Sequence, residues 1–90
     1  MMNIRIIKIT PATVLKVFDK HNVLQEEIEQ ALRNGRPRIR TAGAEQYVAI
    51  GKAKDRHLTI FFRYDASTKE AEITTAYPSS EKQIKAYKKR

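Results

Sequence analysis

Residues 57–64, His-Leu-Thr-Ile-Phe-Phe-Arg-Tyr, form the clearest predicted strand of the chain, because β-branched and aromatic residues fill the segment. Side chains of a strand point alternately to its two faces. One face would carry the apolar set typical of a hydrophobic core, namely Leu58, Ile60, Phe62 and Tyr64. The other would carry His57, Thr59, Phe61 and Arg63. An imidazole, an aromatic ring and a guanidinium on one face indicate a sheet whose second face has a function.

The segment before residue 35 predicts a strand followed by a helical hairpin. Asn3 to Ile9 is rich in isoleucine and favours a short strand, and Thr10-Pro11 is typical of a helix start. His21-Asn22 ends that helix, a second begins at Gln25, and Asn34-Gly35 stops it. The predicted buried stripes are Val14, Leu15 and Phe18, then Leu24, Ile28, Ala31 and Leu32. The acids at 26, 27 and 29 are expected on a solvated face.

After residue 35 the hydrophobic period changes from about 3.6 to 2. Four antiparallel strands are predicted at 36–41, 45–52, 57–64 and 70–77, separated by turns at 42–44, 54–55 and 65–69. In the last strand, simple alternation places Ala71, Ile73, Thr75 and Tyr77 on one face. Ser80 and Gln83 resemble a capping box that opens a last helix to about Lys88. The predicted class is α+β: leading strand, two-helix hairpin, antiparallel meander and C-terminal helix.

Length and composition limit the alternatives. Ninety residues with 41% hydrophobic content suit a single domain, residues 1–90, with 89–90 as a frayed tail. The chain has no cysteine, so it has neither a disulfide framework nor a thiolate metal site. The two histidines are thirty-six positions apart, the three glycines are scattered, and no Gly-x-Ser-x-Gly element occurs. We expect no metal and no cofactor. Without a signal peptide or membrane span, we expect a cytoplasmic protein.

The positive charge is concentrated in the middle of the chain. The net charge is +8, and residues 33–64 hold eight basic and two acidic residues, a net +6. Within this part, Arg36, Arg38 and Arg40 would share one strand face, where their mutual repulsion would be offset by a bound polyanion. The pattern equally fits a charged edge strand that resists aggregation, or a docking patch for an acidic protein.

The residue types suit cleavage of RNA without a metal. That reaction needs a base for the 2′-hydroxyl, an acid for the 5′-oxygen and a stabiliser of phosphate charge. Imidazole, phenol and guanidinium supply these roles, and the candidates are His57, Tyr77 and Arg63. Predicted substrate-binding residues are Lys20, His21, Arg38, Arg40 and Tyr47, with Arg56 as a secondary candidate. Each also has a structural interpretation: Arg63 would pair with Glu72, and His21 would cap a helix.

Several short patterns resemble one family. Lys20-His21-Asn22-Val23 before Glu26-Glu27, the strand end Ile50-Gly51, and Ile73-Thr-Thr-Ala76 followed by Glu81 and Tyr87 are similar to segments of BrnT-type toxins, which belong to the RelE-like ribonucleases. The similarity covers about residues 18–87. Asn22 stands where the family has glycine, and Tyr77 stands where it has arginine.

This resemblance implies a RelE/BrnT-like fold and an endoribonuclease that is the toxin of a toxin–antitoxin pair. It also implies a cognate antitoxin as protein partner in a hetero-oligomer, with RNA as substrate. The alternative is a non-catalytic RNA- or protein-binding module of the same fold.

Overall fold

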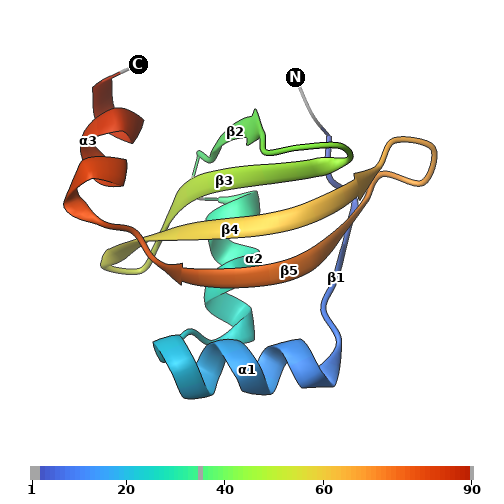
Figure 1. Ribbon diagram of the computed structural model, residues 1–90, viewed down its shortest axis with the longest axis horizontal. Coiled ribbons are helices and arrows are strands. Elements are labelled where there is room, and N and C mark those ends of the chain that lie inside the picture. Colours follow the sequence, from blue (N-terminus) through green and yellow to red (C-terminus); the bar gives the residue numbers. More distant parts are fainter. Residues whose placement is uncertain (1–2, 35, 90) are drawn as a thin grey trace.

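The structure, a computed structural model, describes residues 3–34 and 36–89. Five strands form one sheet in the order β1-β5-β4-β3-β2, in which β1 is parallel to β5 and the other neighbours are antiparallel. The strands are β1 (Ile6–Lys8), β2 (Arg38–Thr41), β3 (Gln46–Ala53), β4 (Arg56–Asp65) and β5 (Glu70–Pro78), and the helices are α1 (Pro11–His21), α2 (Gln25–Arg33) and α3 (Glu81–Lys89). Helix α2 packs behind the sheet and α1 runs along its β5 edge (Figure 1). The α+β class is confirmed. None of these helices is long and apolar enough to span a membrane.

The predicted helix ends are confirmed by their caps. The Thr10 hydroxyl accepts a hydrogen bond from the Thr13 N–H at 3.2 Å, and Asn22 ends α1 in the left-handed region at φ 56°. Ser80 and Gln83 form the expected reciprocal pair, in which each side chain accepts from the other's backbone N–H at 3.2 and 2.9 Å. Short polar side chains therefore set where α1 and α3 begin.

Two strands differ from the sequence expectation. The leading strand is limited to Ile6–Lys8 and pairs in parallel with β5, so the sheet is more than a meander. Arg36 has φ 48°, a left-handed conformation that is incompatible with a strand, so β2 begins at Arg38 and the predicted row of three arginines keeps two. The expected helix stop at Gly35 and the tail residue Arg90 lie outside the described residues.

Helices α1 and α2 cover the first face of the sheet, where the core forms. Leu58, Ile60 and Phe62 are fully buried there, as predicted. Gly51 allows α2 to lie close to β3, because a Cβ at this position would come within 2.5 Å of the Ala31 carbonyl oxygen.

The predicted stripe of α1 is wrong. Val17 is the fully buried residue of that helix, whereas Leu15 and Phe18 are 63% and 46% exposed. Helix α1 lies along the sheet edge, so only a narrow side of it reaches the core (Figure 1). Leu24, assigned to the stripe of α2, is also exposed.

A β-bulge changes which side chains of β5 face the core. Phe61 pairs with Thr75 but Phe62 pairs with Ile73, so Thr74 is an extra residue in β5. Ala71, Ile73 and Ala76 are consequently buried with the core, while Tyr77 pairs with Thr59. The predicted grouping of Thr75 and Tyr77 with Ala71 and Ile73 is therefore wrong.

Glu27 is buried, which corrects its expected place on a solvated face. Its carboxylate accepts two hydrogen bonds from Arg56, at 2.7 and 3.2 Å, and one from the Leu24 N–H at 3.1 Å. Arg56 also donates to the Asn22 carbonyl at 2.7 Å, so this guanidinium joins the α1–α2 corner to β4. The Arg56 hydrogen bond is the main reason that the pKa of Glu27 lies below its ordinary value.

We predict that Glu27→Gln lowers the free energy of unfolding by about 1–3 kcal/mol at pH 7, because it weakens a charge-assisted bidentate pair. A lowered folded-state pKa means that this stability is present above the unfolded pKa and is lost as pH falls through the folded value. The difference between wild type and variant should therefore shrink at pH 3. Urea denaturation at both pH values measures it. Glu26→Gln is the matched control, since the Glu26–Lys54 pair is exposed, and an equal loss in this control would contradict the assignment.

Candidate functional site

The second face of the sheet, opposite α2, carries most of the candidate residues. Strand register arranges them in four rows across the sheet. The first row is Lys52 and His57; the second is Arg38, Ile50, Thr59 and Tyr77; the third is Arg40, Val48, Phe61 and Thr75; the fourth is Gln46, Arg63 and Glu72. The register that the sequence left open is thus resolved: Tyr77 is the neighbour of Thr59.

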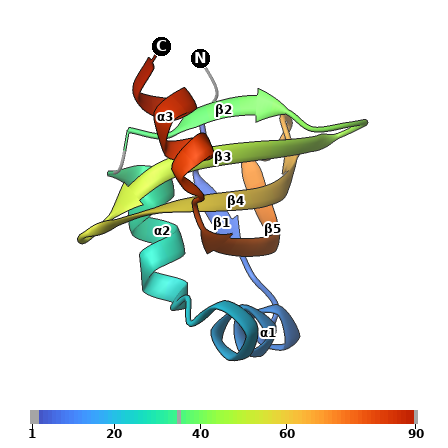
Figure 2. The same ribbon diagram turned by 60° about the vertical axis from the view of Figure 1, so that its left-hand side comes forward.

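Helix α3 crosses the strands over the first two rows (Figure 2). Near its start, Gln83 contacts Thr59 and Tyr77. Near its end, Arg38 Nη1 donates to the carbonyl oxygens of Ala86 and Tyr87 at 3.2 and 3.4 Å. Arg38 therefore stabilises the C-terminal turn of α3. The sequence had predicted only a substrate-binding role for this residue.

A groove runs beside α3 with the third row in its floor. Its volume is about 340 Å³, and its lining combines apolar side chains with cations. Arg40, Phe61 and Lys82 line it together with Gln83. Arg40 is exposed, and among the described residues no ion pair engages it. This groove is the place on the second face where a cation and an aromatic ring are both accessible.

Tyr77 lies between two other rings, one of which is Phe61 of the groove floor. Its ring centroid is 6.2 Å from that of Phe61 and 5.8 Å from that of His21. His21 is the last residue of α1, and the exposed Lys20 precedes it. The structure thus brings Tyr77 together with His21, which the sequence had assigned to substrate binding.

His57 and Arg63 lie far apart on the second face, although both are candidates for the same cleavage reaction. His57 and Arg63 are six positions apart on β4, about 20 Å at the usual rise of a strand. His57 lies in the first row with its ring 5.2 Å from that of Tyr87 on α3.

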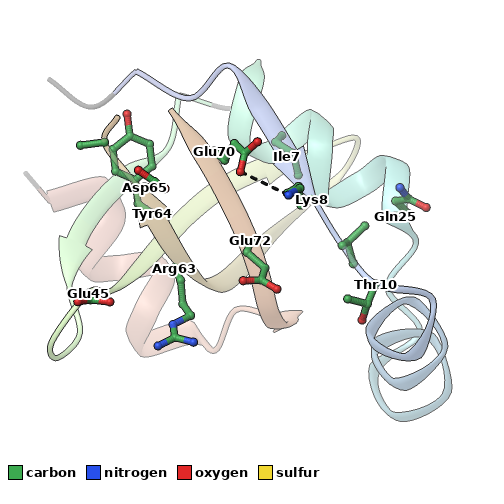
Figure 3. A pocket seen from close by; sticks show the side chains of 12 residues that line it. Ile7, Lys8, Thr10, Gln25, Glu45, Arg63, Tyr64, Asp65, Glu70 and Glu72 are labelled. Atoms are coloured by element: carbon green, nitrogen blue, oxygen red, sulfur yellow. Dashed lines mark ion pairs between the residues drawn. The ribbon is translucent and has the colours of Figure 1, made fainter. Parts of the chain in front are cut away.

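Arg63 is exposed in the fourth row, and its side chain points to the same side as that of its register partner Glu72 (Figure 3). Both residues, with Glu45, line an open cavity of about 960 Å³. No ion pair of Arg63 within 4 Å is formed among the described residues. Arg63 therefore has acidic residues nearby and a guanidinium that is free to bind.

Tyr47 lies on the first face, away from Arg38, Arg40 and Arg63. Its ring stacks on Phe62 at 5.8 Å and meets Tyr64 edge-on at 6.2 Å, so it packs against the core. Its predicted role in substrate binding stays a prediction, separate from the groove beside α3. Gln83, which the sequence indicated only as part of a helix cap, lines the groove together with Lys82. In the part of the chain that the structure describes, no three His, Asp or Glu residues are grouped to hold a metal ion.

The environment of His57 gives a testable titration. Burial, followed by the charges of Lys88 and Lys52, lowers the pKa of His57 below its ordinary value of 6.5. We predict that Tyr87→Ala raises this pKa towards 6.5 by admitting water, and that Lys88→Gln raises it less. An NMR titration of the imidazole follows both changes. An unchanged pKa in Tyr87→Ala would show that α3 does not desolvate this ring.

Comparison with known proteins gives one match. No family model matches the chain, and no curated protein matches its sequence. Among solved structures, the crystal structure of the Brucella abortus ribonuclease toxin BrnT is similar, with a TM-score of 0.69 and 15% sequence identity over 88% of this chain and 100% of that one. The resemblance noted in the sequence is thereby confirmed at the level of the fold: this chain has a BrnT-like fold, the fold of a ribonuclease toxin.

Proposed function

We propose that this protein is a metal-independent endoribonuclease, the toxin of a toxin–antitoxin system, which acts in the cytoplasm and is neutralised by a cognate antitoxin. One observation carries the proposal. In a fold shared with a ribonuclease toxin, the third and fourth rows of the second face leave Arg40, Phe61 and Arg63 uncovered beside α3. Phosphate-binding and base-stacking groups are thus adjacent.

RNA would bind along these uncovered rows. Arg40 and Lys82 line the groove and Arg63 lies one row further, so their cations can contact successive phosphates. Phe61 in the groove floor offers a ring on which a base can stack. Tyr77 touches this ring from the β5 side and so lies next to the bound backbone.

The chemistry would be attack of the 2′-oxygen on phosphorus with rupture of the bond to the 5′-oxygen, leaving a 2′,3′-cyclic phosphate. The 2′-hydroxyl proton passes to an imidazole, and Tyr77 supplies a proton to the departing 5′-oxygen. Arg63 stabilises the charge that develops on the phosphate oxygens. Return of the proton from imidazolium to phenolate, through water, restores both groups.

Contact with the Tyr77 ring favours His21 as the proton acceptor. His57 is the alternative acceptor. Its lowered pKa keeps it neutral at pH 7, as a base requires, but α3 packs over it. Catalysis by His57 would therefore require α3 to move aside, and a group other than Arg63 to stabilise the phosphate charge.

The second candidate function is a binding module without catalysis. The separation of about 20 Å between His57 and Arg63 favours it, because two groups so far apart cannot act on the same phosphate. Glu72 and Glu45 beside Arg63 also weaken the local positive potential.

We predict that Arg63→Ala and Tyr77→Phe each lower RNA cleavage by about 10²- to 10³-fold, because each removes a group that stabilises the transition state. Induced expression of either variant should then leave growth unaffected. His21→Ala should be more damaging than His57→Ala. Cleavage of a labelled RNA, with and without ribosomes, measures these effects. An RNA with 2′-deoxy residues should not be cleaved, because it lacks the attacking 2′-hydroxyl.

Arg33→Ala is the charge-matched control, because Arg33 lies at the end of α2 and donates to the Arg5 carbonyl, away from the second face. This variant should cut RNA like the wild type. A wild-type protein that neither inhibits growth nor cuts RNA in either condition would exclude the nuclease and support the binding module.

A further inference from the structure

The Gln83 side chain links the start of α3 to two residues of the second face. Its Oε1 accepts from the Ser80 N–H at 2.9 Å and from the Thr59 hydroxyl at 3.1 Å. Its Nε2 donates to the Tyr77 hydroxyl oxygen at 3.3 Å. One amide therefore joins a helix cap, a fully buried threonine and the phenol of the candidate site.

The direction of every bond in this network is fixed by one backbone group. The Ser80 N–H can only donate, so the atom of Gln83 that faces it must be the carbonyl oxygen. The amide nitrogen is then the atom that faces Tyr77. Because the Thr59 hydroxyl uses its single proton on Gln83, its short 2.7 Å contact with Ser79 must be donated by Ser79. A flipped amide would set two donors against each other at Ser80.

This direction decides what the Tyr77 hydroxyl can do. Its oxygen accepts from Gln83, so its own proton must point elsewhere. No described residue accepts that proton in a hydrogen bond, and the half-buried Tyr77 ring borders Phe61 in the groove. The proton is consequently available to a molecule that lies against the Tyr77 and Phe61 rings. With an acceptor in place of the amide nitrogen, the phenol would instead turn its proton inward.

We propose that Gln83 is a positioning residue that holds the Tyr77 hydroxyl as a hydrogen-bond donor towards the scissile phosphate. The proposal rests on the nuclease function proposed above. It adds the direction in which the Tyr77 hydroxyl donates its hydrogen bond. It also adds that the first turn of α3 contributes to catalysis, because Gln83 acts through Tyr77.

The test is Gln83→Glu, which keeps the capping box with Ser80 but replaces the donor by an acceptor. The Tyr77 proton should then turn towards the new carboxylate. We expect the phenol pKa of Tyr77, read by NMR, to rise, because a neighbouring negative charge disfavours phenolate. We also expect kcat to fall as far as in Tyr77→Phe, with KM nearly unchanged, and no further loss when Gln83→Glu is added to Tyr77→Phe.

Lys85→Gln is the control for net charge, because it also lowers the net charge by one, but on the exposed side of α3. It should alter neither the Tyr77 pKa nor kcat. An unchanged Tyr77 pKa in Gln83→Glu would overturn the proposal whatever the activity. So would a raised pKa with wild-type kcat. If the wild type cuts no RNA, the nuclease function fails by itself. The hydrogen-bond direction is then judged by the pKa alone, where a rise supports it and no change overturns it.

Discussion

The burial of Thr59 governs the arrangement of the second face. Thr59 is fully buried on the side of the sheet that α1 and α2 leave open, because α3 packs over it. An unsatisfied buried hydroxyl costs about 1–3 kcal/mol, so the bonds to Ser79 and Gln83 favour one position for the start of α3. Arg38 holds the other end. With both ends fixed, α3 covers two rows, and the other two remain open to a ligand.

The bulge at Thr74 is the second determinant of the site. In a strand of unbroken alternation, Ala71, Ile73 and Tyr77 would share one face, and Tyr77 would enter the core. The extra residue shifts the alternation by one, which returns Ala76 to the core and directs Tyr77 to the second face. A local irregularity of β5 therefore brings the phenol next to Phe61 and Gln83.

Features that depend on neighbouring residues in the chain could be predicted from the sequence, and features that depend on packing could not. The order of the elements, the Thr10 and Ser80 caps and the core face of β4 follow from local chemistry and periodicity. The bulge leaves no signal in the alternation of β5. The exposed Leu15 and the buried Glu27 depend on where α1 and Arg56 lie in three dimensions. The separation of His57 from Arg63 has the same origin, because sharing a strand face does not bring two side chains together.

The arginines show why net charge alone is a poor guide to a nucleic-acid footprint. Arg56 is committed to the buried Glu27, and Arg38 to the carbonyl oxygens at the end of α3. Arg40 and Arg63 have exposed guanidinium groups in neighbouring rows. A guanidinium that must break an existing hydrogen bond before it binds phosphate contributes less binding free energy than a guanidinium that is already free. The cationic middle of the chain therefore contributes to folding as well as to the proposed RNA binding, which should depend on Arg40 and Arg63 more than on the total charge.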